Sequence, residues 1–391
     1  MNTDTVALDG IDQGLVHAPQ IDGRAPFRVI GEAPDISEHT VARRYRRMRA
    51  AGILRVVGTL NGARLGYSAW TIRLQCTPDA AGAIAKALAA RPDTSYVYLL
   101  SGGTEISCSA QMPTTDESEA LLLHKLPRTS RITSVSAHLL LGNRALPNNW
   151  AGSACLTPAQ VALLTPSPAE HTDVSLGPAD RLLFDLLSRD GRASYTELAV
   201  ATGWSESTVR RRLTALRQAG ALTFPVDILP TALGFRAEAR LWMSVCPSRL
   251  TAVASTMASH PEVSLVAQTT GRTNLLAAVN CRDSLDLARY LTERIASLDA
   301  IHMIETAPVI RTVKRAGRPA SARTLNREQS TWHHPAPDPL SGCSVRSRGT
   351  RRAEGGLSGS RASWTAGHAV RWCVWTGASR TRVACRTKRG S

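Results

Sequence analysis

The stretch S-E-S-T-V-R-R-R-L-T-A-L-R, from Ser205 to Arg217, has a near-copy earlier in the chain, S-E-H-T-V-A-R-R-Y-R-R-M-R, from Ser37 to Arg49. In both copies apolar side chains recur at the i, i+4, i+7 spacing of a helix that buries one face. A serine begins each copy, where its hydroxyl can cap the first free amides of a helix. After one glutamate, every further charge in both copies is positive. We interpret the two stretches as helices that contact DNA through an arginine face.

The sequence around these helices is duplicated. Residues 8–54 align without a gap on residues 176–222, with 18 identities in 47 positions. The run D-G-R-A begins at both Asp22 and Asp190 in this alignment. The correspondence continues, with one inserted residue, to the last strand predicted in each copy. The chain is therefore a tandem repeat of one module.

Each module predicts two parts. The first is helix, helix, recognition helix and a short β wing, which is a winged helix-turn-helix. The second alternates as β-α-β-β-α-β, the ferredoxin-like order. The predicted fold class is thus α+β. The expected domains are helix-turn-helix 1 at 1–60, ferredoxin-like domain 1 at 64–144, a linker at 145–175, helix-turn-helix 2 at 176–228, ferredoxin-like domain 2 at 232–315, and a disordered basic tail at 316–391.

The first copy of the helix-turn-helix has the weaker pattern. Gly14 and Pro19 interrupt its first helix, and Pro34 stands at a turn position. A proline inside a helix costs about 3 kcal/mol. We therefore expect this helix to be short or distorted, and the sequence leaves open whether the first copy binds DNA.

Composition narrows the class of protein. The net charge is +16, but residues 321–391 hold twelve arginines and one lysine against three acidic residues, so the repeated part is only mildly basic. No apolar run approaches the roughly 20 residues of a membrane span, and the first 20 residues lack the basic start of a secretory signal. We expect a cytoplasmic protein with no membrane association. The tail indicates disorder, with an aberrant reading-frame extension or non-specific adhesion to nucleic acid as alternatives.

The cysteines do not form a metal-binding pattern. The eight cysteines include no C-x-x-C pair, and no histidine pair has zinc spacing. Four of them, at positions 76, 108, 246 and 281, lie in apolar, strand-like sequence. We expect buried free thiols there, and neither a metal nor a cofactor is predicted.

The motifs together resemble the Lrp/AsnC family of transcriptional regulators. The resemblance rests on D-R-L-L-F-D-L-L-S-R-D-G-R-A-S-Y-T-E-L-A from Asp180, the helix from Ser205, A-G-A-L from Ala219 and G-R-T-N-L from Gly271. It covers both modules and excludes the linker and the tail. It implies a sequence-specific regulator of transcription that binds double-stranded DNA, forms homo-oligomers and responds to a small effector such as an amino acid. The tandem form resembles fused two-module members, in which one chain supplies both DNA-binding units.

The predicted DNA contacts follow from the two helices. First-turn side chains of a recognition helix reach base edges, and arginines pair with guanine or hold phosphate. An ordinary solvated face is the alternative interpretation. Arg49 and Arg217, farther along, are better placed for phosphate. The candidate DNA-binding residues are Ser37, His39, Thr40, Arg43, Arg44, Arg47, Ser205, Ser207, Thr208, Arg210, Arg211 and Arg212.

The resemblance also points to an effector loop between the second and third strands of each ferredoxin-like domain. The family pattern there is G-x-x-D, and this chain has G-G-T-E and G-R-T-N at the matching places. Only the first keeps a carboxylate that could meet an amino group. A plain β-turn is the alternative. The candidate effector-binding residues are Gly102, Thr104, Glu105, Gly271, Thr273 and Asn274.

One enzymatic alternative stays open. Sirohaem decarboxylases are similar to this family, keep the helix-turn-helix and can occur as fused pairs. Their chemistry needs histidine and arginine near a tetrapyrrole, and the histidines here form no pattern that singles out a site. The doubled arginine helix favours a regulator, and we predict no catalytic residues and no enzymatic activity.

Overall fold

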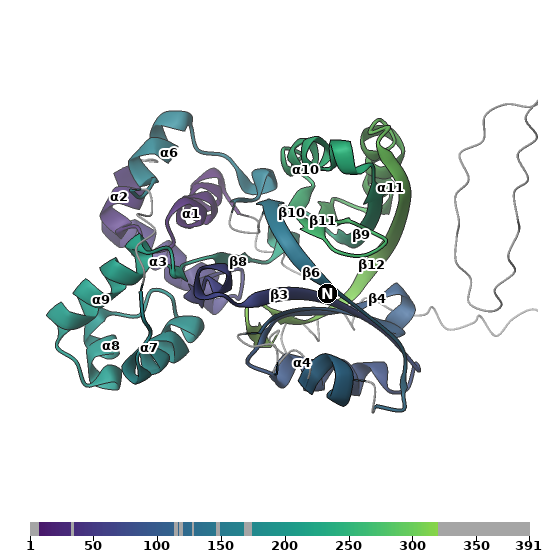
Figure 1. The fold of residues 1–391 in the computed structure, drawn as a ribbon. Helices are drawn as coiled ribbons and strands as arrows, with labels where there is room; N and C mark the ends of the chain where they lie inside the picture. Colours follow the sequence, from purple (N-terminus) through teal and green to yellow (C-terminus); the bar gives the residue numbers. More distant parts are fainter. Residues whose placement is uncertain are drawn as a thin grey trace, which may run out of the picture. The chain divides into compact units, whose positions relative to one another are not determined.

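The structure is a computed structural model that describes residues 8–319 except 33–34, 113–115, 117–119, 127–128, 146–148 and 168–173. Pro34 and the predicted tail beyond residue 319 lie outside the described residues. Two helix-turn-helix units and two βαββαβ units follow one another along the chain (Figure 1). This confirms the α+β fold class and the duplication. No helix in the described ranges is long and apolar enough to cross a membrane.

The second helix-turn-helix has local signals that agree with its fold. Its helices are α7 (Pro178–Arg189), α8 (Tyr195–Thr202) and α9 (Glu206–Gln218). The Ser205 hydroxyl accepts a hydrogen bond from the Thr208 amide at the start of α9. Gly203, with φ of 72°, ends α8 in the left-handed region that favours glycine. The apolar stripe of α9 packs against α7 and α8 in one core.

The first helix-turn-helix is more regular than its sequence indicates. Its helices are α1 (Gly10–Ile21), α2 (Phe27–Glu32) and α3 (Glu38–Ala50). Helix α1 has 12 residues despite Pro19, the same length as α7. The expectation of a short helix was therefore wrong.

The reason lies in the segment predicted as a linker. This segment contains α6 (Pro158–Leu164), whose Leu164 joins the core of the first helix-turn-helix. The His17 ring Nδ1 accepts hydrogen bonds from the amides of Cys155 and Leu156 at 3.1 and 3.0 Å. The Gln20 amide donates to the Ser153 hydroxyl at 2.6 Å. These contacts support α1 and offset the backbone hydrogen bond that Pro19 lacks.

The wings are exchanged between the modules. They comprise β1 (Leu54–Val56), β2 (Thr59–Leu60), β7 (Leu222–Thr223) and β8 (Val226–Ile228). Strand β1 pairs with β8 and β2 pairs with β7, so every wing pair joins one module to the other. The two pairings are related by the sequence repeat, because Leu54 opposite Ile228 corresponds to Leu222 opposite Leu60. The two helix-turn-helix units are thus held together by backbone hydrogen bonds.

The ferredoxin-like units have the predicted order. The first contains β3 (Ser68–Cys76), α4 (Ala81–Ala90), β4 (Thr94–Leu100), β5 (Glu105–Met112), the π-helix η3 (Ala120–Lys125) and β6 (Ile132–Ala145). The second contains β9 (Ala237–Val245), α10 (Leu250–Ala258), β10 (Val263–Thr269), β11 (Leu275–Cys281), α11 (Ser284–Arg289), the π-helix η8 (Tyr290–Ile295) and β12 (Ile301–Arg315). Short 3-10 turns lie at Gly62–Leu65, Ser101–Gly103, Ala151–Ser153, Pro230–Leu233 and Pro247–Arg249.

The two sheets join because their last strands cross from one module to the other. The first half of β6 pairs with β3 and its end pairs with β10, while β12 pairs first with β9 and then with β4. The strands therefore form a closed ring. Aromatic and aliphatic side chains of both modules fill the space between the sheets, among them Tyr98 and Trp242. These strands extend to residues 145 and 315, and each gains a partner in the other module toward its end.

The predicted start of the tail at residue 316 was too early. After β12 the chain turns back as β13 (Arg318–Pro319), which pairs with the end of β12. The Gly317 amide donates to the Ser95 carbonyl at 2.8 Å. The second ferredoxin-like unit therefore continues at least to residue 319.

Candidate nucleic-acid interface

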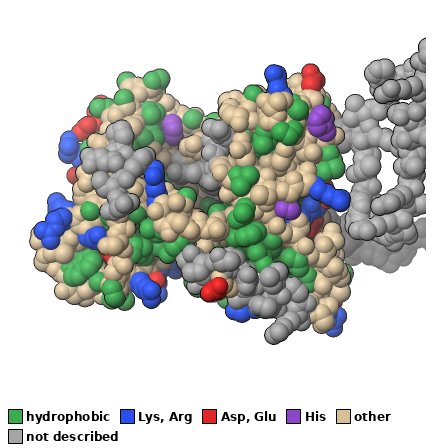
Figure 2. All heavy atoms as spheres, in the orientation of Figure 1, with side chains coloured by type: hydrophobic (Ala, Val, Ile, Leu, Met, Phe, Trp, Pro, Cys, Tyr) green, Lys and Arg blue, Asp and Glu red, His purple; other side chains and the backbone are tan. Residues whose placement is uncertain are grey.

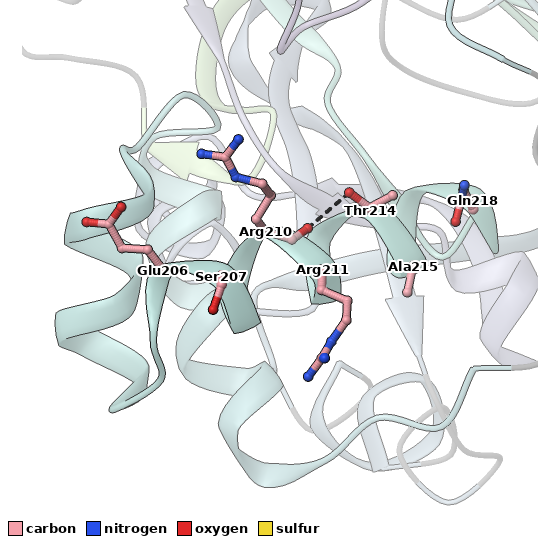
Figure 3. A pocket seen from close by; sticks show the side chains of 7 residues that line it. All are labelled: Glu206, Ser207, Arg210, Arg211, Thr214, Ala215 and Gln218. Atoms are coloured by element: carbon pink, nitrogen blue, oxygen red, sulfur yellow. Dashed lines mark hydrogen bonds between the residues drawn. The ribbon is translucent and has the colours of Figure 1, made fainter.

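The outward face of α9 is the best-defined candidate surface. Seven residues of this helix line an open depression of about 660 Å³ (Figure 3), namely Glu206, Ser207, Arg210, Arg211, Thr214, Ala215 and Gln218. Arg210 and Arg211 extend to opposite sides of the helix axis (Figure 3). Figure 2 shows basic side chains over the region where Figure 1 labels α9. A helix with such a face can enter a DNA groove without disturbing its own core.

The two outward arginines differ in their surroundings. The Arg210 guanidinium lies 4.6 Å from the centroid of the Tyr195 ring, which holds it by a cation–π contact. Arg211 is exposed, and within the described ranges it has no ion-pair partner. Its counterpart in α3 is Arg43, which is also exposed and likewise unpaired there. Arg211 and Arg43 are therefore the predicted DNA contacts that stay most available to a ligand.

A second pair of arginines anchors each recognition helix to its own module. The Arg212 guanidinium donates to both carboxylate oxygens of Asp180, at 2.8 and 2.7 Å, and to the Ser175 carbonyl at 2.6 Å. The matching Arg44 donates to Asp12 at 2.9 Å and to Asp9 at 2.6 Å. Asp180 and Asp12 are buried. We infer that Arg212 and Arg44 stabilise the helix-turn-helix and are poorly placed to contact a base.

Asp180 gives this anchor a pH dependence. Burial opposes the charged form, but hydrogen bonds from Arg212 and from the Gly177 amide lower the pKa of Asp180 below its ordinary value. A carboxylate with a lowered pKa contributes its full stability above the ordinary value of about 3.9 and loses it as the pH falls through the lowered value.

We expect the wild-type protein to be more stable than the Asp180→Asn variant at pH 6, and the difference to shrink below about pH 4. Local unfolding free energies of α7 and α9, measured by hydrogen exchange at several pH values, check this. A difference that stays constant from pH 6 to pH 3 would contradict the role of the charged carboxylate.

Two further arginines connect the modules. Arg217 forms an ion pair with Asp22 at 2.8 Å, and Arg49 forms one with Asp190 at 2.7 Å. These pairs are equivalent under the sequence repeat, and each joins a recognition helix to the other module. The sequence predicts that Arg49 and Arg217 hold phosphate, whereas in the structure each guanidinium pairs with an aspartate of the other module.

The repeated D-G-R-A run forms a reciprocal clasp. Arg24 donates to the carbonyls of Gly191 and Ala193 at 2.8 and 3.0 Å. In return Arg192 donates to the carbonyls of Gly23 and Ala25, both at 2.7 Å. The glycines are needed because a Cβ at Gly191 would lie 2.8 Å from the Val57 carbonyl carbon. We name these four contacts the arginine clasp. It explains why D-G-R-A is identical in both modules.

The serines predicted as DNA contacts act partly as caps. The Ser205 hydroxyl lies 2.8 Å from the Ser207 hydroxyl and 2.9 Å from that of Thr208. Ser37 has the matching contact with Thr40 at 3.0 Å. These bonds fix the first turn of each helix. Ser207 and His39, which correspond to each other, are the exposed side chains that the caps present to solvent.

Three positions on these faces are not among the candidate DNA-binding residues given above. Thr214 and Gln218 lie in the same depression as Arg211, and Arg46 is exposed on α3. Their spacing of three or four residues from the predicted contacts was the available signal. Thr214 and Gln218 lie beyond the first turn and the arginine run of α9, from which its candidate residues come.

The effector positions are engaged internally. Glu105 is buried and forms an ion pair with Arg73. Arg73 also donates to Glu305 at 2.7 Å, and its guanidinium lies 4.1 Å from the Trp242 ring centroid. Burial opposes the charge of Arg73, but Glu305 and Glu105 together raise its pKa. The carboxylate that could meet an effector amine is therefore neutralised by the chain itself.

The matching position in the second module has no carboxylate and no free amide. The Asn274 side chain accepts from the Val245 amide and donates to the Val245 carbonyl, both at 2.8 Å. Gly271, with φ of 101°, faces the ring of His138, and a Cβ there would lie 2.3 Å from that ring. The Thr104 and Thr273 carbonyls accept hydrogen bonds within the strand ends, from Cys76 and Thr269. Gly102, with φ of 80°, lies in open space.

The buried cysteines have the properties of packed thiols. Cys76, Cys108 and Cys281 are free and buried, whereas Cys246 is half-buried. Burial raises the pKa of Cys108 and of Cys281 to about 12, so both are protonated near neutral pH.

Comparison with known proteins identifies the modules. The AsnC-type helix-turn-helix domain matches residues 8–49 and 179–217, and the Lrp/AsnC ligand binding domain matches residues 238–319. An uncharacterized HTH-type transcriptional regulator of Pyrococcus abyssi is 32% identical over 150 residues, which are 38% of this chain and 94% of that protein. The HTH-type transcriptional regulator FL11 of Pyrococcus horikoshii is 31% identical over 142 residues, 36% of this chain and 93% of that protein.

One solved structure matches both modules at once. The siroheme decarboxylase NirDL superimposes with a TM-score of 0.55, covering 82% of this chain and 99% of its own, at 17% identity. At this identity the likeness concerns the fold alone. The sequence relatives, both helix-turn-helix matches and the ligand binding domain agree on one assignment. The chain belongs to the Lrp/AsnC family and is a DNA-binding transcriptional regulator.

Proposed function

We propose that the outward faces of α9 and α3 bind double-stranded DNA, with Arg211 and Arg43 as the principal charged contacts. The observation that supports this proposal is that some arginines of these helices pair with acidic residues and others do not. Arg212, Arg44, Arg217 and Arg49 have acidic partners inside the protein, whereas Arg211 and Arg43 are exposed at matching positions. Two equivalent arginines that have no ion pair within the described ranges suit two successive major grooves of one duplex.

The first module takes part in this proposal because its helix-turn-helix is intact. Helix α1 is complete, and α3 has its serine cap and buried stripe. The exchanged wings and the arginine clasp join it to the second unit. We propose that one chain presents both recognition helices, and that contacts between chains, which give the family its homo-oligomers, add to this arrangement.

Replacing both Arg211 and Arg43 with alanine should weaken DNA binding by about 100-fold, because each bidentate contact is worth about 1–3 kcal/mol. The slope of log affinity against log salt should also fall if either arginine holds phosphate. Fluorescence anisotropy with a duplex enriched by the full chain from a random pool measures both. Thermal unfolding should be unchanged, because neither side chain has an ion-pair partner in the part of the chain that the structure describes.

Arg131→Ala is the matched control for this experiment. Arg131 is 60% exposed, lies at the start of β6 and pairs only with exposed Asp79 among the described residues. Its removal should leave DNA affinity within about twofold. If the double variant bound as tightly as the wild type, the proposed contact surface would be wrong.

We further propose that a small effector acts on the ferredoxin-like units without direct use of Glu105 or Asn274. An amino acid at Glu105 would have to displace Arg73, and Asn274 is occupied by the β9 backbone. The match to the Lrp/AsnC ligand binding domain supports ligand binding as such. We also propose that this chain is a regulator without enzymatic activity, which rests on the names of its sequence relatives.

A further inference from the structure

The structure allows the two recognition helices to be compared within one chain. Their inward faces are equivalent. Each has three large apolar residues in its core, an arginine that binds a buried aspartate of its own module, and an arginine that pairs with an aspartate of the other module. These inward contacts of α3 and α9 therefore match, except that α3 has in addition the ion pair of Arg47 with Asp12.

The outward faces are not the same. At the seven positions that line the depression on α9, only glutamate at the start and Arg211 recur in α3. The other five positions change between α9 and α3 from Ser207 to His39, Arg210 to Ala42, Thr214 to Arg46, Ala215 to Arg47, and Gln218 to Ala50. The sequence difference is thus concentrated where each helix faces solvent.

We propose that one chain recognises an asymmetric operator, in which α9 and α3 specify two different half-sites. This inference rests on the DNA-contact surface proposed above and concerns the sequence that this surface selects. A homodimer has two identical recognition helices and therefore favours an inverted repeat. This chain presents two helices with different contact chemistry.

The difference bears on base recognition. Helix α9 offers two adjacent arginines, and Arg210 is held in place against Tyr195. Arginine pairs bidentately with guanine in the major groove, so this helix favours a guanine-containing half-site. The matching ring in the first module is Phe27, which stacks on Arg192 at 4.1 Å, and α3 has Ala42 where α9 has Arg210.

Helix α3 offers other groups. His39 stands at its first turn, and Arg43 and Arg46 follow on the exposed face. The Arg46 side chain donates to the Ala42 carbonyl at 3.2 Å, and Arg47 donates to Asp12 at 2.5 Å. Arg46 lies along its own helix and Arg47 is engaged by Asp12, so both are less free than Arg43 to reach a base edge. The α3 half-site should therefore be less strictly specified than the α9 half-site.

The two helix-turn-helix units are held in one fixed arrangement. The exchanged wing strands and the arginine clasp join the two helix-turn-helix units. Each bound chain thus places one α9 and one α3 in a fixed order, and the operator has a direction.

Selection of bound duplexes from a random DNA pool tests the proposal. The full-length wild-type chain should enrich a site with two unlike half-sites, bound by one chain. In a transplant variant, His39→Ser, Ala42→Arg, Arg46→Thr and Ala50→Gln give α3 the face of α9. Arg47 is kept because it pairs with Asp12. This variant should enrich an inverted repeat of the α9 half-site and bind the wild-type site about tenfold less tightly.

The reverse transplant is the matched variant, with Ser207→His, Arg210→Ala, Thr214→Arg and Gln218→Ala in α9. It should enrich an inverted repeat of the α3 half-site, so the proposal stays testable if one variant does not fold. An inverted repeat selected by the wild type, or an unchanged site for both variants, would overturn the asymmetry. A pool without any enrichment would instead overturn the proposed DNA-contact surface, and this inference with it.

Discussion

Replacing Arg212 with alanine should lower the local unfolding free energy of the second helix-turn-helix by about 3 kcal/mol, at the lower end of what loss of a partner to a buried charge costs. The reason is Asp180, whose side chain is 3% exposed and which, among the described residues, would keep only the Gly177 amide as a partner. The estimate stays at the lower end because the Arg212 side chain is 26% exposed and water can replace it in part. Hydrogen exchange across α7 and α9 measures the loss.

Arg211→Ala is the control within the same helix. Arg211 is exposed, and its replacement should change stability by less than about 0.5 kcal/mol. Replacing Arg211 should thus lower DNA affinity, whereas replacing Arg212 should lower stability. Equal stability of the two variants would show that Asp180 does not depend on Arg212. The sequence predicts that both arginines contact DNA, and the ion pair of Arg212 with Asp180 leads us to propose that Arg211 is the contact.

The second large effect concerns the arginine clasp. Replacing Arg24 and Arg192 together with alanine removes four hydrogen bonds from charged donors to backbone carbonyls of the opposite module. Such bonds are worth about 1.5–3 kcal/mol each, so the paired units should lose on the order of 6 kcal/mol. Urea unfolding and exchange of the wing amides in β1 and β8 should both show the loss.

Each single variant provides a further check on the clasp. Because the two arginines are equivalent under the repeat, Arg24→Ala and Arg192→Ala should have similar effects. Arg28→Ala is the control, since Arg28 is 71% exposed and pairs only with Glu32 one turn away among the described residues, an interaction worth about 0.3–0.5 kcal/mol. If the double variant unfolded at the same urea concentration as Arg28→Ala, the clasp would have no role in holding the units together.

Much of this fold follows from local sequence. The serine caps and the buried stripes of α3 and α9 are properties of a few consecutive residues, and each was predicted correctly. The internal repeat added the order of the modules, because two copies that agree at 18 of 47 positions must share one fold. The alternation of strands and helices then gave the ferredoxin-like units.

The tertiary structure decided which charges are free. The sequence by itself determined two capped helices with arginine faces, since periodicity and capping depend on near neighbours along the chain. It did not distinguish Arg211 from Arg212, because the carboxylate that binds Arg212 is 32 residues away. Nor did it show the exchanged wings, the long strands β6 and β12 or the support of α1 by α6. All of these depend on contacts between segments distant in the sequence, whose pairing is fixed only when the two modules pack together.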